Sequence, residues 1–235
     1  MTTKKQFEKA FTDFLDSVYD QAVGRDTNRL HTVDSYLKAR RDNIGAYAAY
    51  MPAILGIEIP DEAFYHPMIV NLADLVGDLL SLDNVSKSRF HRADRGGSRF
   101  SPQLGQDLAS YNKEQAAGDD QYNILTIVMH QYSYTLDEAL KWTADYHDEV
   151  KTRFLDGIER LPSFGPGVDP QLQQFIQAIA IWPRANDCWN FESGRYFGSK
   201  GPEIQKTRVV PIMPKIADIH CTLRGDSVVV APVEL

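Results

Sequence analysis

The residues best suited to chemistry lie on either side of a segment unlike the rest of the chain. Residues 85–106 carry five basic side chains against one Asp and show no apolar period, whereas helix-like sequence ends just before them and resumes at Asp107. If the segment is set aside, Asn84, Ser110 and Glu114 fall at positions i, i+4 and i+8 of one helix. Residues at this spacing share one face of a helix, so their side chains would lie close together.

Amide, hydroxyl and carboxylate oxygens are hard ligands, which suit Mg²⁺ held together with a substrate phosphate. Lys113, next to Glu114, adds a point charge that would attract the same phosphate. The sequence therefore predicts a Mg²⁺ site made by Asn84, Ser110 and Glu114, with Lys113 as a phosphate contact.

The restored motif resembles the Asn/Ser/Glu metal-binding triad of class I terpene synthases. The following stretch, residues 110–130, resembles the fungal sesquiterpene synthase branch of that family. The resemblance extends over residues 5–84 and 107–215. Three motifs in order at matching spacings make it more specific than the triad alone.

Two further segments carry the resemblance. Residues 36–45 resemble the segment that bears the family's diphosphate-sensing arginine, a role that the resemblance gives to Arg41, with Arg40 as the alternative. Residues 184–196 resemble the helix that ends in a diphosphate-binding Arg-Tyr pair. The resemblance thus implies that Arg195 and Tyr196 bind diphosphate.

The resemblance implies an all-α helical bundle around a central cavity. It also implies a Mg²⁺-dependent lyase that ionises a prenyl diphosphate, farnesyl diphosphate in this branch, and cyclises it to a sesquiterpene with release of diphosphate. Ionisation needs the charge of the leaving group neutralised in a dry cavity, and metal, arginine and tyrosine hydroxyl groups supply that stabilisation.

One family motif has no counterpart in this sequence. The family places an aspartate-rich metal motif upstream of the Arg41 segment. Here Asp16 and Asp20 have the wrong spacing, and residues 61–62 lie in the wrong place. The chain is therefore expected to begin inside the domain. An alternative stays open: a catalytically inactive fragment, or a helical interaction protein that retains only part of the fold.

The basic segment itself has two explanations. Valine codons begin with GT and one glutamine codon is CAG, so Val85 to Gln106 could be read from a short in-frame intron left in the coding sequence. The rival explanation is a genuine surface loop inserted between metal ligands. We favour the intron, because an insertion would separate Asn84 from Ser110.

Helical periodicity dominates the rest of the chain. Apolar residues fall on one face of segments 7–18, 68–80 and 136–158, and a fourth helix begins near Leu172. Pro67 suits the first turn of the second segment, and Thr135 with Glu138 forms a capping box for the third. Pro183 falls inside the helix that leads to Arg195, where it removes a backbone hydrogen bond and is costly unless the helix is kinked there. The pattern predicts one partial all-α domain over residues 1–215, interrupted at 85–106 and followed by a poorly integrated tail at 216–235.

Composition narrows the function classes. The chain of 235 residues is 43% hydrophobic and 24% charged, which is typical of a globular domain. Its net charge of −7 disfavours nucleic-acid partners. Two cysteines, no apolar stretch long enough to span a membrane and no signal sequence predict a cytoplasmic protein. Its oligomeric state is left open.

Overall fold

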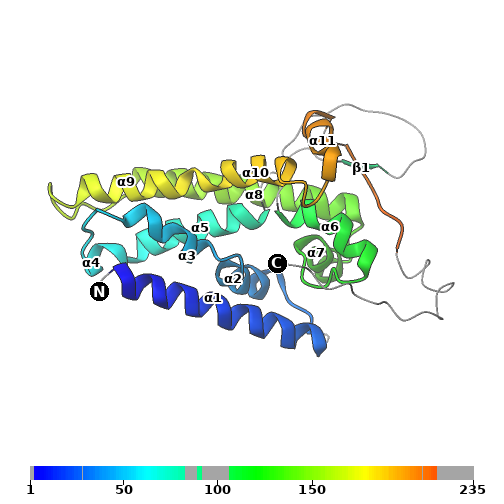
Figure 1. Ribbon diagram of the computed structural model, residues 1–235, viewed down its shortest axis with the longest axis horizontal. Coiled ribbons are helices and arrows are strands. Elements are labelled where there is room, and N and C mark those ends of the chain that lie inside the picture. Colours follow the sequence, from blue (N-terminus) through cyan, green and yellow to red (C-terminus); the bar gives the residue numbers. More distant parts are fainter. Residues whose placement is uncertain (1–2, 28, 83–88, 92–105, 208, 216–235) are drawn as a thin grey trace, which may run out of the picture.

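The computed structural model describes residues 3–27, 29–82, 89–91, 106–207 and 209–215. Their regular structure is almost entirely helical, which confirms the all-α prediction (Figure 1). The helices are α1 (Thr3–Asp26), α2 (Val33–Asn43), α3 (Ala46–Tyr50), α4 (Asp61–Phe64), α5 (Pro67–Leu82), α6 (Gln106–Ala117), α7 (Ile124–Tyr132), α8 (Leu136–Glu159), α9 (Asp169–Ala180), α10 (Trp182–Glu192) and α11 (Gly201–Thr207). Short 3₁₀ turns cover Met51–Ile54 and Gly198–Lys200.

Helix α5 forms the centre of the bundle. It contacts α8, α2, α6, α9 and α10, and in Figure 1 it runs between the α8–α10 layer and the layer of α1 to α3. Most of its side chains are buried because it is covered on several sides, and Leu72, Leu75 and Val76 are at most 1% exposed. A mainly apolar helix of this kind suits the centre of a bundle.

Local sequence signals set several helix ends. Thr135 caps α8 in a capping box with Glu138, and Pro67 is the first residue of α5, both as predicted. Pro183 occupies the second position of α10, a new helix that begins just after α9 ends. The helix is thus broken at the proline, whose missing N–H falls where a helix has no partner for it.

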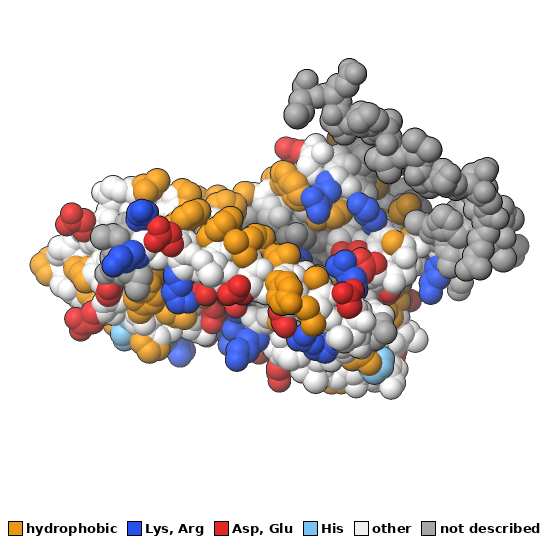
Figure 2. Space-filling view, turned by 60° about the horizontal axis from the view of Figure 1, so that its bottom comes forward, with side chains coloured by type: hydrophobic (Ala, Val, Ile, Leu, Met, Phe, Trp, Pro, Cys, Tyr) orange, Lys and Arg blue, Asp and Glu red, His pale blue; other side chains and the backbone are white. Residues whose placement is uncertain are grey.

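The apolar face of helix α1 is more exposed than the apolar face of a core helix. Phe7, Phe11 and Val18 are 41–43% exposed, whereas Gln6 and Gly24 on another face are buried. Phe14 on the same face is half-buried close to Gly45, so described residues cover only part of this face. Amphipathic periodicity normally marks a buried surface. Figure 2, which turns the α1 side toward the viewer, shows apolar side chains at the surface between acidic and basic ones.

The only strands among the described residues are β1 (Arg89–His91) and β2 (Val209–Pro211), which pair in parallel with Arg89 opposite Val209. Most of the basic segment at 85–106 and all of the tail at 216–235 lie outside the described residues. The intron hypothesis and the predicted domain bounds therefore stay predictions. None of the described helices is long and apolar enough to cross a membrane.

Candidate functional site

Helix α6 presents two of the predicted metal ligands on one face. Ser110 is buried and Glu114, one turn later, is half-buried. The side-chain amide of Asn123 donates to Glu114 Oε2 at 2.9 Å and approaches Ser110 Oγ at 3.5 Å. The Asn123 amide nitrogen is thus a hydrogen-bond donor that Ser110 and Glu114 share.

Asn123 is held in this position because it caps a helix. It is the N-cap of α7, and its Oδ1 accepts a hydrogen bond from Leu125 N at 3.0 Å. Its amide group is then available to Glu114, and the whole side chain is buried. Sequence analysis missed this residue. The asparagine before an apolar run signals a helix cap, but only the packing of α7 on α6 brings it to Glu114.

Two other predicted residues belong to the same region. Asn84 lies outside the described residues; α5 ends at Leu82, and α5 contacts α6. Lys113 is exposed beside Glu114. The described ligand set of one hydroxyl and one carboxylate oxygen fits Mg²⁺, which prefers oxygen donors and keeps several waters. Within the described residues, no group of three or more His, Cys, Asp or Glu could hold a metal ion.

The predicted Arg-Tyr pair follows the end of α10. Ser193 Oγ accepts a hydrogen bond from Arg195 N at 3.2 Å, and Gly194 turns the chain with φ at 72°. The Arg195 guanidinium lies 5.6 Å from the centre of the Tyr196 ring, within cation–π range. The turn thus holds the two side chains together, with Arg195 exposed and Tyr196 half-buried.

Several groups act on the hydroxyl of Tyr196. Burial raises the pKa of this hydroxyl. The charge of Arg195, the hydrogen bond of Arg195 and the charge of Arg40 lower that pKa, while the Glu114 carboxylate raises it. Arg40 also donates from Nη1 to Asn43 Oδ1 at 2.9 Å.

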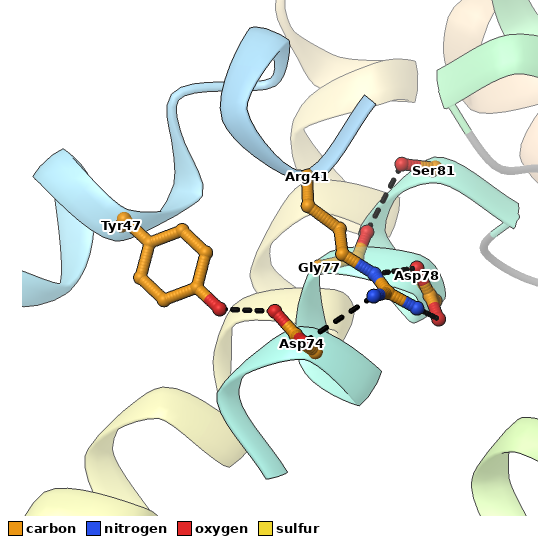
Figure 3. A network of polar contacts seen from close by, with 6 residues as sticks. All are labelled: Arg41, Tyr47, Asp74, Gly77, Asp78 and Ser81. Atoms are coloured by element: carbon orange, nitrogen blue, oxygen red, sulfur yellow. Dashed lines mark hydrogen bonds and ion pairs between the residues drawn. The ribbon is translucent and has the colours of Figure 1, made fainter. Parts of the chain in front are cut away.

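The neighbouring Arg41 points elsewhere. Its Nε and Nη2 each donate to Asp78 at 2.8 Å, and its Nη1 donates to Asp74 at 3.3 Å (Figure 3). Arg41 thus pairs with α5 and also lines the cavity between α1, α2, α3, α5 and α9, whereas Arg40 pairs with Asn43 inside α2. The diphosphate contact that the resemblance gives to Arg41, with Arg40 as the alternative, stays a prediction.

A cavity of about 340 Å³ lies between α1, α2, α3, α5 and α9. Its wall has an aromatic and aliphatic part, which includes Tyr47, Tyr50, Phe64, Ile69, Val70, Ala73 and Phe175. It also has a charged part, made by Lys9, Asp13, Lys38, Arg41, Asp42 and Asp74. Burial raises the pKa of Tyr50, whose hydroxyl is enclosed. Val70, Ala73 and Gly77 fall on one face of α5, which continues toward its end at Leu82.

Fold and site together define a helical-bundle protein that gathers oxygen ligands and cationic side chains at several helix ends. Such a donor set suits a metal-bound phosphate. A family profile described as "Terpene synthase family 2, C-terminal metal binding" matches residues 2–153. The chain therefore belongs to the terpene synthase family.

Curated relatives agree with this assignment. Sesquiterpene synthase 14 of Postia placenta is 53% identical, over all of this chain and 60% of the relative. Delta(6)-protoilludene synthase 18 of the same fungus is 43% identical, over 97% of this chain and 59% of the relative. The chain thus spans about three fifths of the length of these relatives.

Solved structures share the fold. An α-eudesmol synthase superposes with a TM-score of 0.65 at 17% identity, over 83% of this chain and 57% of that one. Germacradien-4-ol synthase from Streptomyces citricolor gives 0.60 at 18% identity, over 81% and 56%. At this level of identity the comparison supports the fold alone.

Proposed function

We propose that this chain carries part of the active site of a Mg²⁺-dependent terpene cyclase, which ionises farnesyl diphosphate and cyclises it to a sesquiterpene. The observation that carries the proposal is the pair of oxygen ligands on one face of α6, where Ser110 and Glu114 both meet the buried amide of Asn123. Family membership and the names of the relatives, sesquiterpene and protoilludene synthases, support the same reaction class.

Ser110 and Glu114 would hold Mg²⁺ together with Asn84. The ion, when bound, neutralises negative charge on the leaving diphosphate. Asn123 orients the carboxylate through its 2.9 Å hydrogen bond to Oε2, as outer partners of metal ligands commonly do. Oxygen ligands held in advance in this way cost little reorganisation when the metal binds.

The diphosphate would meet the cationic residues around this metal position. Arg195 and Tyr196 offer guanidinium and hydroxyl donors, and Lys113 adds a charge from the exposed side of α6. Arg41 is the arginine of α2 that we propose for this role, with Arg40 as the alternative. Arg41 lines the cavity, and Asp78 and Asp74 hold its guanidinium.

The hydrocarbon part of the substrate would occupy the aromatic cavity. Its volume of about 340 Å³ is in the range of small-molecule sites. Val70 and Ala73 line it from α5. The aromatic and aliphatic part of the wall would keep water from a reactive cation, which is the condition that cyclisation needs.

The competing function, a chain that keeps part of the fold without catalysis, has its own support. The apolar face of α1 is exposed, and the chain spans about three fifths of its relatives. The two functions differ in whether the isolated chain binds diphosphate. This difference can be measured without turnover.

The test is calorimetric titration of the full chain with inorganic pyrophosphate, with and without Mg²⁺. We expect binding only with Mg²⁺ and an affinity about tenfold lower in Glu114→Gln, because one ligand charge is lost. Glu149→Gln, on the exposed face of α8, is the matched control and should bind like the unaltered chain. Absence of Mg²⁺-dependent binding would favour the non-catalytic function. Incubation with farnesyl diphosphate and gas chromatography of the products then tests cyclisation itself.

A further inference from the structure

Two carboxamide side chains of α6 hold the segment that follows α11. Asn112 Oδ1 accepts a hydrogen bond from Met213 N at 2.7 Å, and Gln115 Nε2 donates to Met213 O at 2.8 Å. The Met213 side chain, in contrast, is 47% exposed. The contact is therefore made to the main chain of Met213. We call Asn112 and Gln115 the clamp, and residues 209–213, which begin with β2, the strap.

The clamp is built into its own helix. Gln115 Nε2 also donates to Asn112 O at 3.1 Å, so the donor that meets the strap is oriented by the backbone of α6. Asn112 and Gln115 are each only 8% exposed. A buried carboxamide that loses a partner still bears the cost of its desolvation, so the clamped arrangement is favoured over an open one.

The strap is the far end of a length of chain that carries the Arg195–Tyr196 turn. Val210 of the strap is 2% exposed, and Ile212 packs against the core. Before the strap, α11 lies against the end of α10, and Figure 1 shows the segment after α11 running beside α6. Residues 193–213 are thus fixed at one end by α10 and at the other by α6.

The turn itself has little local support. Residues 192–195 and 198–200 are exposed, and the backbone bonds that close the turn, from Gly198 N to Gly194 O and from Lys200 N to Phe197 O, lie within it. Its place in the molecule therefore depends on what holds the chain on either side. One of those supports is α6, which also carries Glu114.

Clamp and candidate metal ligands use different faces of α6. Residues two apart on a helix point about 160° from each other, so Asn112 points away from Ser110. The front of α6 presents Ser110 and Glu114 to Asn123, and the back holds the strap. One helix thus connects the metal ligands to the chain that carries the diphosphate contacts.

We propose that Asn112 and Gln115 are positioning residues: by clamping Met213, they fix the loop that carries Arg195 and Tyr196 relative to Glu114. The inference rests on the proposed function only for the identity of the ligand. The hold of the clamp on the strap, and through it on the turn, is a property of the protein alone.

The polarity of the clamp gives a matched pair of variants. Asn112→Asp keeps an acceptor for Met213 N, whereas Gln115→Glu removes the donor and sets a carboxylate oxygen against Met213 O. Both variants change the net charge by the same amount, so each controls for the charge of the other. Gln115→Met removes the donor without adding charge and serves as a second variant if a carboxylate is not tolerated. Gln173→Glu, on the exposed face of α9, is the surface control.

The first measurement is pyrophosphate binding with Mg²⁺ by calorimetry on the full chain. We expect Gln115→Glu and Gln115→Met to lower the affinity about tenfold, as loss of one hydrogen bond does, and Asn112→Asp and Gln173→Glu to bind like the unaltered chain. In an Arg195→Gln background, Gln115→Met should cause little further loss, because the clamp acts through the turn. Full additivity, or unchanged affinity in both Gln115 variants, would overturn the inference.

Amide hydrogen exchange without ligand separates failure of this inference from failure of the proposed function. Gln115→Met should speed exchange at Met213, Gly198 and Lys200 and leave α8 as protected as in the unaltered chain. If the unaltered chain binds no pyrophosphate, the proposed function fails and the exchange rates still decide the inference. Unchanged exchange at Gly198 and Lys200 in Gln115→Met would refute positioning.

Discussion

Gly201→Ala should disrupt the junction that carries the Arg195–Tyr196 turn. Gly201 is buried at the start of α11, against the end of α10. A Cβ at this position would lie 1.8 Å from the Phe191 carbonyl oxygen and 2.9 Å from its carbonyl carbon. The backbone at Gly201 is helical, with φ of −50° and ψ of −51°, so alanine would meet no conformational obstacle. The predicted effect is therefore purely steric.

The size of the effect follows from what blocks the methyl group. The obstructing atoms belong to the backbone of α10, so no side-chain rotation relieves the clash, and α11 must move by roughly 1.5 Å to restore an ordinary contact. Overpacking of this kind costs about 1–3 kcal/mol and sometimes more, against about 0.5–1 kcal/mol gained from alanine in a helix. We expect a net loss of about 2 kcal/mol, which for a chain of this size lowers Tm by about 4–8 °C.

Gly167→Ala is the matched control, since a Cβ at Gly167 would meet no atom within 4 Å. Urea unfolding followed by circular dichroism gives the stability of both variants. Amide hydrogen exchange over α11 detects local undocking if the helix detaches before the bundle unfolds. If Gly201→Ala matches Gly167→Ala in stability and in α11 exchange, the steric argument is wrong. Because the Arg195–Tyr196 turn lies between α10 and α11, pyrophosphate binding should weaken together with the docking of α11.

Three further outcomes are expected. Phe191→Ala should lower the free energy of unfolding, measured with urea, by about 3–5 kcal/mol, and Phe11→Ala should lower it far less, because the Phe191 ring is 1% exposed and the Phe11 ring 43%. Equal losses of unfolding free energy would show that the apolar face of α1 is covered in solution. Burial lowers the pKa of His147 to about 4, so between pH 6.5 and 4 the unfolded chain binds a proton that the folded chain does not. Stability should fall as the pH drops through that window, and His147→Gln should flatten the slope of unfolding free energy against pH. Thr135→Ala should lower the free energy of unfolding by about 1 kcal/mol because it removes the cap of α8, while Thr135→Ser should keep most of the stability. An alanine variant as stable as the serine variant would argue against the capping box.

Much of the fold could be predicted from the sequence because its signals are local. Apolar periodicity indicated helices at the places now occupied by α1, α5, α8 and α9. Thr135 and Pro67 marked helix starts, because both effects are local. A cap accepts a hydrogen bond from a backbone N–H of the first turn, and a first-turn proline lacks an N–H that would have no partner there. Pro183 likewise signalled a break that the structure places between α9 and α10.

Spacing along the sequence also brought Ser110 and Glu114 together, because residues four apart on a helix must share a face. Spacing could not identify Asn123 as a site residue, because Asn123 contacts two helices: it caps α7 and donates a hydrogen bond to Glu114 on α6. A cap is visible in the sequence, but a contact between helices depends on how they pack. The same limit applies to the apolar face of α1, where periodicity identifies the face and cannot say what covers it.

The amino-acid sequence by itself determined the helices at α1, α5, α8 and α9, the cap of α8, the family resemblance and the residue types of the candidate site. Only the tertiary structure decided what the two adjacent arginines of α2 contact. Arg40 and Arg41 have the same chemistry, and their positions in the sequence do not reveal the partners of their side chains. The packing of α2 on α5 does, because the buried Asp78 carboxylate binds the Arg41 guanidinium in a fork, whereas Arg40 donates to Asn43 within its own helical segment.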